Sequence, residues 1–309
     1  MNSESKIFVA GASGMVGSAV VRALKKNSYK NILIPSRKDL DLLSQKDTYT
    51  YINDNRPDYV IVCAAKVGGI HSNNTYRAQF IHENLAIALN LIHGSHLADV
   101  ENLCFLGSSC IYPKFSDQPI KEEYLLSGGL EPTNEPYAIA KIAGLKLCES
   151  YKNNYGRNYF SVMPTNLFGP NDNYNLETSH VLPALLHKLH NAKVNKENVV
   201  EVWGTGAPRR EFLYVDDLAN AILFLCRNKT NYDYLNIGYG SDISIKELAI
   251  LIMDVIDYSC ELSFNSNKPD GTPRKLLDSG LVRELGWKPQ YNFEDALRLT
   301  YRDFLSNLK

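Results

Sequence analysis

The chain has 309 residues, of which 44% are hydrophobic and 22% are charged, and 33 Lys and Arg against 34 Asp and Glu leave a net charge of -1. These values are typical of an ordinary folded protein, and they exclude a disordered chain or a coiled coil. The near-zero net charge also provides no basic excess for binding a nucleic-acid backbone or an anionic membrane surface.

Short apolar runs alternate with helical patterns through the first half of the chain. The predicted strands are Lys6–Ala10, Ile32–Pro35, Tyr59–Ala64, Leu103–Leu106 and Tyr159–Pro164. Helices are predicted where apolar residues recur three and four positions apart, at Val16–Lys26, Gln79–Leu97 and Pro136–Tyr155. Strands that alternate with helices predict βαβ units, and therefore a Rossmann-type, doubly wound parallel sheet.

The pattern loosens beyond residue 170, where Asn171–Thr178 is polar and Val199–Trp203 is a predicted strand. We expect a Rossmann domain over residues 1–170, to which segments near 205–240 return, and a smaller C-terminal α/β lobe over residues 171–309 that completes a substrate cleft. Helices are predicted in the second half at His180–Ala192, Asp216–Cys226, Ile245–Tyr258 and Phe293–Leu305.

The six cysteines lie far apart, without CxxC or CxxH spacing. This spacing argues against a zinc site and against a disulfide framework, so no metal is expected. The first residues are polar and lead directly into a strand, and the apolar runs are too short to cross a bilayer. We therefore expect a cytoplasmic protein.

A glycine-rich segment, Gly11-Ala-Ser-Gly14-Met-Val-Gly17, follows the first predicted strand and opens the first predicted helix. Glycine permits a tight turn and lets backbone N–H groups approach a pyrophosphate, to which the helix N-terminus adds its positive dipole end. The position of the segment at the first strand–helix junction favours dinucleotide binding over a plain turn, which is the alternative.

Ser36-Arg37 follows the second predicted strand, where the ribose of a bound dinucleotide is expected. An NAD-specific site would carry an acidic residue there, to accept hydrogen bonds from the ribose hydroxyls. A guanidinium pairs instead with a 2′-phosphate, so Arg37 favours NADP(H). A solvated surface arginine is the alternative.

Tyr137 and Lys141 are four residues apart, and therefore lie on one face of a predicted helix. A nearby cation stabilises phenolate and lowers the pKa of tyrosine, which suits a proton donor to a carbonyl. Ser108, at the end of a predicted strand, can hydrogen-bond the same carbonyl. The alternative is an ordinary surface pair on a helix, since this spacing is common by chance.

The order of these motifs resembles the extended short-chain dehydrogenase/reductase family, and longer stretches are similar to the GDP-L-fucose synthases within it. The resemblance runs from Lys6 to about Trp287. It is carried by Ala64–Ile70, Gly107–Pro113, Glu131–Gly144, Ser161–Leu167, Arg210–Phe212 and Lys268–Asp278.

The resemblance implies an NADPH-dependent enzyme that epimerises C3 and C5 of GDP-4-keto-6-deoxy-D-mannose and reduces its C4 ketone. It implies that Ser108, Tyr137 and Lys141 form the reducing triad, with Cys110 as the epimerisation base and His180 as its partner acid. The ketone acidifies the protons at C3 and C5, which a thiol and an imidazole can remove and return near neutral pH. A structural thiol and a core histidine are the alternatives at the last two positions.

The resemblance also implies which residues bind the cofactor and the GDP-sugar. Trp203 offers an aromatic face, Arg210 a fork for the pyrophosphate and Asp270 an acceptor for guanine or ribose. The expected substrate-binding residues are Lys188, Trp203, Arg210, Asp270 and Lys275, the last as a cation for the phosphates. The expected cofactor-binding residues are Gly11, Ala12, Ser13, Gly14, Met15, Val16, Gly17, Arg37, Asp41, Leu42, Ala64, Ala65, Leu106, Gly107, Lys141, Pro164, Asn166, Leu167 and His180.

The chain departs from the family pattern at two places. Lys188 stands where the family more often has arginine, which keeps the charge and loses the fork. Ala12-Ser13 stands where a basic or bulky pair is common, which leaves Arg37 more responsible for the preference for NADP(H).

Two other functions stay open at this point. One is a C4 reductase of another GDP-4-keto sugar, such as a 6-deoxyheptose, with or without epimerisation. The other is a non-catalytic nucleotide-binding relative, against which the intact triad argues. The resemblance further implies a homodimer in which Gln79–Leu97 and Pro136–Tyr155 pair across a two-fold axis, with the GDP-sugar as the other partner and no nucleic acid or membrane.

Overall fold

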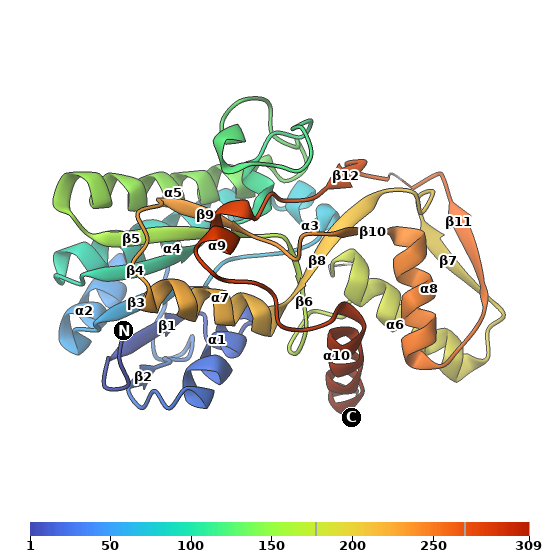
Figure 1. The fold of residues 1–309 in the computed structure, drawn as a ribbon, viewed down its shortest axis with the longest axis horizontal. Helices are drawn as coiled ribbons and strands as arrows, with labels where there is room; N and C mark the ends of the chain where they lie inside the picture. Colours follow the sequence, from blue (N-terminus) through green and yellow to red (C-terminus); the bar gives the residue numbers. More distant parts are fainter. Residues whose placement is uncertain (177, 269, 309) are drawn as a thin grey trace.

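A parallel six-stranded sheet lies at the centre of the computed structural model, which describes residues 1–176, 178–268 and 270–308 (Figure 1). The chain runs from β1 out to β2 and returns to β3 on the other side of β1. Ligands of α/β sheets bind at the carboxyl ends of the strands beside such a reversal. The predicted doubly wound sheet is confirmed. Its strands in spatial order are β2 (Ile32–Leu33), β1 (Ile7–Ala10), β3 (Tyr59–Val62), β4 (Asn102–Leu106), β5 (Asn158–Pro164) and β9 (Tyr234–Ile237).

Alternate side chains of β1 explain why helices cover both faces of this sheet. Ile7 and Val9 belong to one apolar cluster, with α1 and α7, whereas Phe8 and Ala10 belong to another, with α2, α4 and α5. Because both faces are buried, the strands are continuous apolar runs. The covering helices are α1 (Met15–Lys26), α2 (Gln45–Asn55), α4 (Arg77–Leu97), α5 (Glu135–Tyr155) and α7 (Val215–Arg227).

The second half of the chain builds a separate apolar cluster beside the sheet (Figure 1). Strand β8 is the centre of a small sheet, with β6 and β12 parallel to it and β10 antiparallel, while β7 and β11 form a parallel pair. These strands are β6 (Asn166–Phe168), β7 (Val199–Trp203), β8 (Arg209–Tyr214), β10 (Asp242–Ser244), β11 (Glu261–Asn265) and β12 (Arg274–Lys275). The helices packed with them are α6 (Val181–Asn195), α8 (Ile245–Ile256) and α10 (Phe293–Asn307).

Short helical segments complete the fold, and none of the helices in the described ranges is both long and apolar enough to cross a bilayer. Helix α7 and strand β9 follow β8 in the chain; α7 packs on the central sheet, and β9 joins it beside β5. The division of the chain into two domains near residue 170 stays a prediction. The short segments are α3 (Ile70–Thr75), η1 (Ser109–Ile111), η2 (Glu122–Tyr124) and α9 (Gly280–Glu284).

The predicted strands and long helices are present with small shifts of their ends. The second strand stops at Leu33, two residues before the predicted Pro35, whose missing N–H cannot extend a ladder. The third strand ends at Val62 rather than at Ala64. Six strands (β6, β8, β9, β10, β11 and β12) and the helices α2, α3 and α9 were not predicted. The polar segment at 171–178 includes Glu177, which lies outside the described residues.

Candidate active site

The glycine-rich segment forms a turn that only glycine fits at two positions. Gly11 has φ +83°, and a Cβ there would lie 2.7 Å from the backbone of Ala64. A Cβ on Gly17 would lie 2.1 Å from the Gly11 carbonyl oxygen, to which the Gly14 N–H donates at 3.1 Å. The first N–H groups of α1 have no partner within the helix, so this turn fits the pyrophosphate of a dinucleotide.

Arg37 lies on the exposed loop after β2, and no ion pair or hydrogen bond holds its side chain in the described part of the chain. The loop itself is held by Asp39, which accepts from the Ser36 N–H at 3.0 Å and from the Ser36 hydroxyl at 2.6 Å. These hydrogen bonds lower the pKa of Asp39. The guanidinium is therefore free to take a phosphate.

The other predicted cofactor-binding residues lie at the ends of central strands, in β6 of the small sheet or on the loop after β2. Asn166 donates its side-chain amide to the Glu211 carbonyl at 2.8 Å, so part of that amide is already engaged. Ala64 and Ala65 follow β3, Leu106 and Gly107 are at the end of β4, Pro164 ends β5, Asn166 and Leu167 lie in β6, and Asp41 and Leu42 lie on the loop.

Strand β4 and helix α5 bring the predicted reducing triad together. The ammonium of Lys141, one turn after Tyr137, lies 5.7 Å from the centre of the Tyr137 ring and donates to the Leu106 carbonyl at 2.7 Å. Ser108 hydrogen-bonds the Tyr137 phenol and accepts from the Cys110 N–H at 3.2 Å. A hydroxyl, a phenol and an ammonium therefore share the carboxyl edge of the sheet.

The electrostatics of this triad differ from the sequence-based expectation. Burial raises the pKa of Tyr137, the neighbouring Cys110 raises it further, and only the hydrogen bond from Ser108 lowers it. Burial lowers the pKa of Lys141 to about 8, so the ammonium does not carry its full charge throughout the physiological range. The expected lowering of the phenol pKa is not seen, because desolvation dominates the shift and raises the pKa. Tyr137 is consequently a protonated donor.

Cys110 lies two residues after Ser108, in the short helical turn η1. Two nitrogen donors contact its sulfur: the Asn134 amide at 3.4 Å and the Lys275 ammonium at 3.6 Å. The ammonium of Lys275 lies at this sulfur, and its predicted contact with the phosphates of the substrate stays a prediction. Asn134 was not singled out from the sequence, although it is part of the stretch Glu131–Gly144 that carries the family resemblance.

His180 is the residue immediately before α6, and it follows the residues of the triad in the sequence. It keeps contact with solvent, but the protein around its ring lowers its pKa, and the charge of Lys275 lowers it further. The loop before it is held by the Gly69 N–H, which donates to the Thr178 carbonyl at 2.9 Å. Lys275 therefore acts electrostatically on His180 and contacts Cys110.

The predicted nucleotide residues Lys188 and Trp203 meet on α6 and β7. The indole is 54% exposed, and the ammonium groups of Lys188 and Lys268 each lie 4.9 Å from the ring centre. Burial lowers the pKa of Lys188, and the charge of Lys268 contributes to the shift. Lys268 was missed as a site residue, although it begins a stretch that resembles the family.

Arg210 and Asp270 lie close enough for the carboxylate to affect the guanidinium. Burial lowers the pKa of Arg210, and Asp270 opposes that shift. The Asp270 carboxylate accepts from the Thr205 N–H at 2.7 Å and from the Thr205 hydroxyl at 2.9 Å. Asp270 thus holds the turn after Trp203, and its predicted contact with guanine or ribose stays a prediction.

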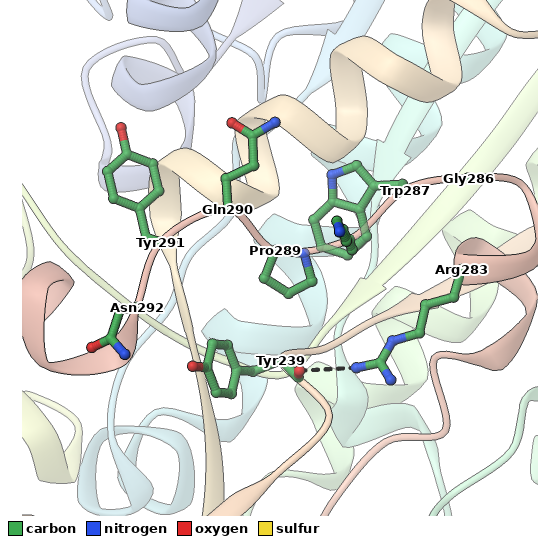
Figure 2. A pocket seen from close by; sticks show the side chains of 9 residues that line it. Tyr239, Arg283, Gly286, Trp287, Pro289, Gln290, Tyr291 and Asn292 are labelled. Atoms are coloured by element: carbon green, nitrogen blue, oxygen red, sulfur yellow. Dashed lines mark hydrogen bonds between the residues drawn. The ribbon is translucent and has the colours of Figure 1, made fainter.

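A cavity of about 560 Å³ lies elsewhere, beside the buried Trp287, and none of the predicted site residues lines it (Figure 2). Arg283 crosses it and donates to the Tyr239 carbonyl at 2.9 Å. The chemistry-bearing side chains lie at the sheet edge, so we place the active site there and not at this cavity.

The chain matches the model of the NAD dependent epimerase/dehydratase family over residues 7–238. It is 52% identical over 304 residues to GDP-L-fucose synthase 1 of Arabidopsis thaliana, an alignment that covers 98% of this chain and 94% of the relative.

Solved structures show the same fold over the whole length. A GDP-L-fucose synthetase from Naegleria fowleri bound to NADP is 32% identical, with a TM-score of 0.92 over 100% of this chain and 95% of that one. A GDP-mannoheptose C4 reductase from Campylobacter jejuni with NADP bound is 36% identical, with a TM-score of 0.91 over 99% of both chains.

Proposed function

Because the chain belongs to the NAD dependent epimerase/dehydratase family and, within it, to the GDP-L-fucose synthases, we propose that it converts GDP-4-keto-6-deoxy-D-mannose to GDP-L-fucose with NADPH. One observation carries the proposal beyond family membership. The Cys110 N–H donates a hydrogen bond to the Ser108 hydroxyl, which also hydrogen-bonds Tyr137. Groups suited to epimerisation and groups suited to reduction therefore share one site.

The epimerisation uses the acidity that the C4 ketone gives to its neighbouring carbons. Cys110 removes the proton from C3 or C5, the electron pair moves into the C4 enolate, and a proton returns to the opposite face of the carbon. Burial lowers the pKa of His180, and Lys275 lowers it further, so its imidazolium is a stronger acid but a minor form near neutral pH. In that protonated form His180 supplies the proton. Donors at the developing enolate oxygen, Ser108 and Tyr137, stabilise its charge.

The reduction of C4 then needs a proton for the carbonyl oxygen. Tyr137 holds its proton, because burial raises its pKa, and Ser108 fixes the direction of the phenol. Lys141 lies one turn away and provides positive charge while it is protonated. These three groups orient and protonate the oxygen, whereas bound NADPH supplies the hydride.

NADPH fits the residues of the sheet edge. The turn at Gly11 and Gly17 leaves no room for a Cβ and opens backbone N–H groups to the pyrophosphate. Arg37 has no acidic partner in the described ranges, and its guanidinium is available to the 2′-phosphate. Solved relatives that carry NADP support the same preference.

The second function that an observation favours is reduction of another GDP-4-keto sugar. The GDP-mannoheptose C4 reductase matches the fold as well as the fucose synthetase does. A pure reductase needs neither Cys110 nor His180. Both residues are present at one site in this chain, with Lys275 beside them, which favours an enzyme that also epimerises.

Hydrogen exchange separates the two functions. The enzyme and the keto sugar are incubated in deuterated water without NADPH, and C3 and C5 are followed by NMR. We expect deuterium at both carbons with the natural enzyme and none with Cys110→Ser, because a hydroxyl is too weak an acid to replace the thiol at neutral pH. Reduction of C4 without any exchange by the natural enzyme would refute the epimerase half.

A second variant isolates the reducing half. Tyr137→Phe keeps the ring and its packing but deletes the proton donor, so NADPH oxidation should fall by about 10²–10⁴ while cofactor binding survives. Tyr155→Phe removes a phenol from the exposed far end of the same helix and should oxidise NADPH at the natural rate. Near-natural turnover by Tyr137→Phe would reject the assignment of the donor.

The proposal includes a homodimer in the cytoplasm. Helices α4 and α5 pack together, and each exposes large apolar side chains: Leu89 is 50%, Leu97 is 58% and Ile139 is 41% exposed. Apolar residues exposed on neighbouring helices support pairing with a second copy. The six cysteines are free thiols, which suits a reducing compartment.

A further inference from the structure

The sulfur of Cys110 is surrounded by donors. The Asn134 amide nitrogen lies 3.4 Å from it and the Lys275 ammonium 3.6 Å. Within the described ranges, no hydrogen bond is donated by its S–H. A neutral thiol is a weak donor and a weak acceptor, whereas a thiolate only accepts. Two converging N–H donors therefore suit the thiolate form of Cys110.

The backbone around Lys275 is fixed at three points, so the ammonium does not reach the sulfur by chance. Lys275 pairs with Arg210 in the ladder between β12 and β8. The next N–H, of Leu276, donates to the Gln118 side chain at 2.8 Å, and the Leu277 N–H donates to the buried Glu211 carboxylate at 3.0 Å. Such anchoring keeps the side chain near Cys110 at low entropic cost.

The charge of Lys275 is not neutralised by an acidic neighbour. No carboxylate lies within ion-pair distance of its ammonium among the residues that the structure describes, whereas the adjacent Arg274 pairs with Asp242. Lys275 is half-buried, which strengthens its field. The groups that face it are Cys110 and His180, with Tyr137 beyond the sulfur.

We infer that Lys275, aided by Asn134, stabilises the thiolate of Cys110 and so positions the base of the epimerisation. The inference rests on the proposed function for its role in turnover, but the contact itself does not. When the base acts, the C–H bond at C3 or C5 breaks, an S–H bond forms, and the electron pair moves into the enolate. The sulfur loses its negative charge in that step, and the ammonium remains available to the enolate or to the imidazole.

The test measures the second-order rate of alkylation of Cys110 by iodoacetamide in the full chain without substrate, at pH 7 and at pH 9.5. Cys110→Ser gives the background from the other thiols, and mass spectrometry of the peptide confirms the site. We expect Lys275→Met to react about tenfold or more slowly at pH 7, since the thiolate is the reacting form and a charged hydrogen bond to it is lost.

The pH and two further variants separate charge from structure. At pH 9.5, where a free cysteine thiol in water is largely ionised, Lys275→Met should react at nearly the rate of the natural protein. Lys275→Arg should restore most of the rate at pH 7. Arg274→Met removes a cation from the same two-residue strand and should react as the natural protein does. An equal deficit at both pH values would show a steric defect and would overturn the inference.

Deuterium exchange at C3 and C5 of the keto sugar tests the proposed function separately from this inference. If Cys110 is alkylated in Lys275→Met at the rate of the natural protein, while the KM for the GDP-sugar is raised, the inference is overturned. Lys275 would then be assigned to binding the phosphates of the substrate. Slow alkylation by Lys275→Met together with slow exchange at C3 and C5 would support it. If the natural enzyme gives no exchange while Lys275→Met still alkylates slowly, the proposed function fails and the contact stands.

Discussion

Lys141 is the residue that we expect to set the pH range in which the proposed site works. The residue is 3% exposed, and among the residues that the structure describes its ammonium has one hydrogen-bond acceptor, the Leu106 carbonyl. Burial penalises the charged form of a lysine, and the pKa falls to about 8. Tyr137 shifts in the other direction, since burial raises the pKa of its phenol. The two groups therefore titrate far apart, with the lysine first.

This order predicts the pH dependence of the reduction. Lys141 is protonated below pH 8 and loses its proton as the pH rises through 8, so kcat/KM for reduction should fall above that point. The profile is measured with NADPH and the keto sugar between pH 6 and pH 10. A profile that stays level between pH 7 and pH 9 would contradict the role of Lys141, because the raised pKa of the Tyr137 phenol lies above that range.

Arg37 is the residue on which we propose that cofactor choice depends. Arg37→Asp replaces a cation by an anion where the 2′-phosphate is expected, so the affinity for NADPH should fall about ten- to hundredfold while the gap to NADH narrows. Binding is followed by fluorescence titration of both cofactors. Lys26→Asp makes the same charge change at the far end of α1 and should alter neither affinity. Unchanged NADPH binding by Arg37→Asp would remove the residue from the site.

At the scale of elements, the turn between β1 and α1 is the least tolerant part of the site. A Cβ on Gly17 would lie 2.1 Å from the Gly11 carbonyl oxygen, and backbone cannot move aside cheaply. Gly17→Ala should therefore cost about 1–3 kcal/mol of folding stability, as overpacking does, and weaken NADPH binding. Urea denaturation and cofactor titration measure both effects.

Gly14→Ala is the matched comparison for stability, three residues earlier in the same turn. A Cβ there would lie 3.6 Å from the Gly11 oxygen, an ordinary contact, and the residue has φ -78°. We expect its midpoint of denaturation to stay close to that of the natural protein. Equal losses of stability in the two variants would mean that crowding at Gly17 is not the cause.

The sequence predicted the elements whose local pattern is strong and missed those that depend on tertiary contacts. Helix α2 was missed because only Thr48 and Ile52 are buried on it, so it has almost no apolar periodicity. Strand β8 was missed because it contains Glu211, which is fully buried and held by backbone N–H groups from Gly240 and Leu277. Nothing local indicates that a charged residue is buried.

The same distinction applies to the site. The spacing of Tyr137 and Lys141 on one helix, and the glycine turn, were readable from the sequence because they are local. The meeting of Lys275 with Cys110 joins residues far apart in the chain and depends on β12 docking onto β8. Desolvation of Tyr137 was equally invisible, since burial is a property of the packed structure.

At the scale of the whole molecule, one segment connects the central sheet to the second half of the chain. Residues 276–278 exchange backbone hydrogen bonds with Ile120, whose N–H donates to Leu276 and whose carbonyl accepts from Asp278, both at 2.8 Å. Glu211 holds the same segment from the other side. Lys275 directly precedes this segment and contacts Cys110. The environment of the proposed base therefore depends on how the two halves of the chain pack.

Helices α4 and α5 form the surface through which we propose that two copies pair. Leu89 on α4 and Ile139 on α5 are 50% and 41% exposed, on helices that pack against each other beside the central sheet (Figure 1). A glutamate at either position would bury a charge in an apolar interface, which is costly without a partner. Leu89→Glu and Ile139→Glu should therefore lower the mass measured by light scattering at micromolar concentration from twice 34.8 kDa to 34.8 kDa.

Ile250→Glu is the control for this surface, because Ile250 on α8 is exposed to the same extent, 41%, in the other part of the molecule. It should leave the dimer intact. The natural chain at a monomeric mass would refute the dimer, and dissociation by Ile250→Glu alone would move the interface to α8. Since the proposed active site lies at the carboxyl edge of the sheet, the helix variants should keep NADPH binding. A loss of the dimer is therefore separable from a loss of the fold.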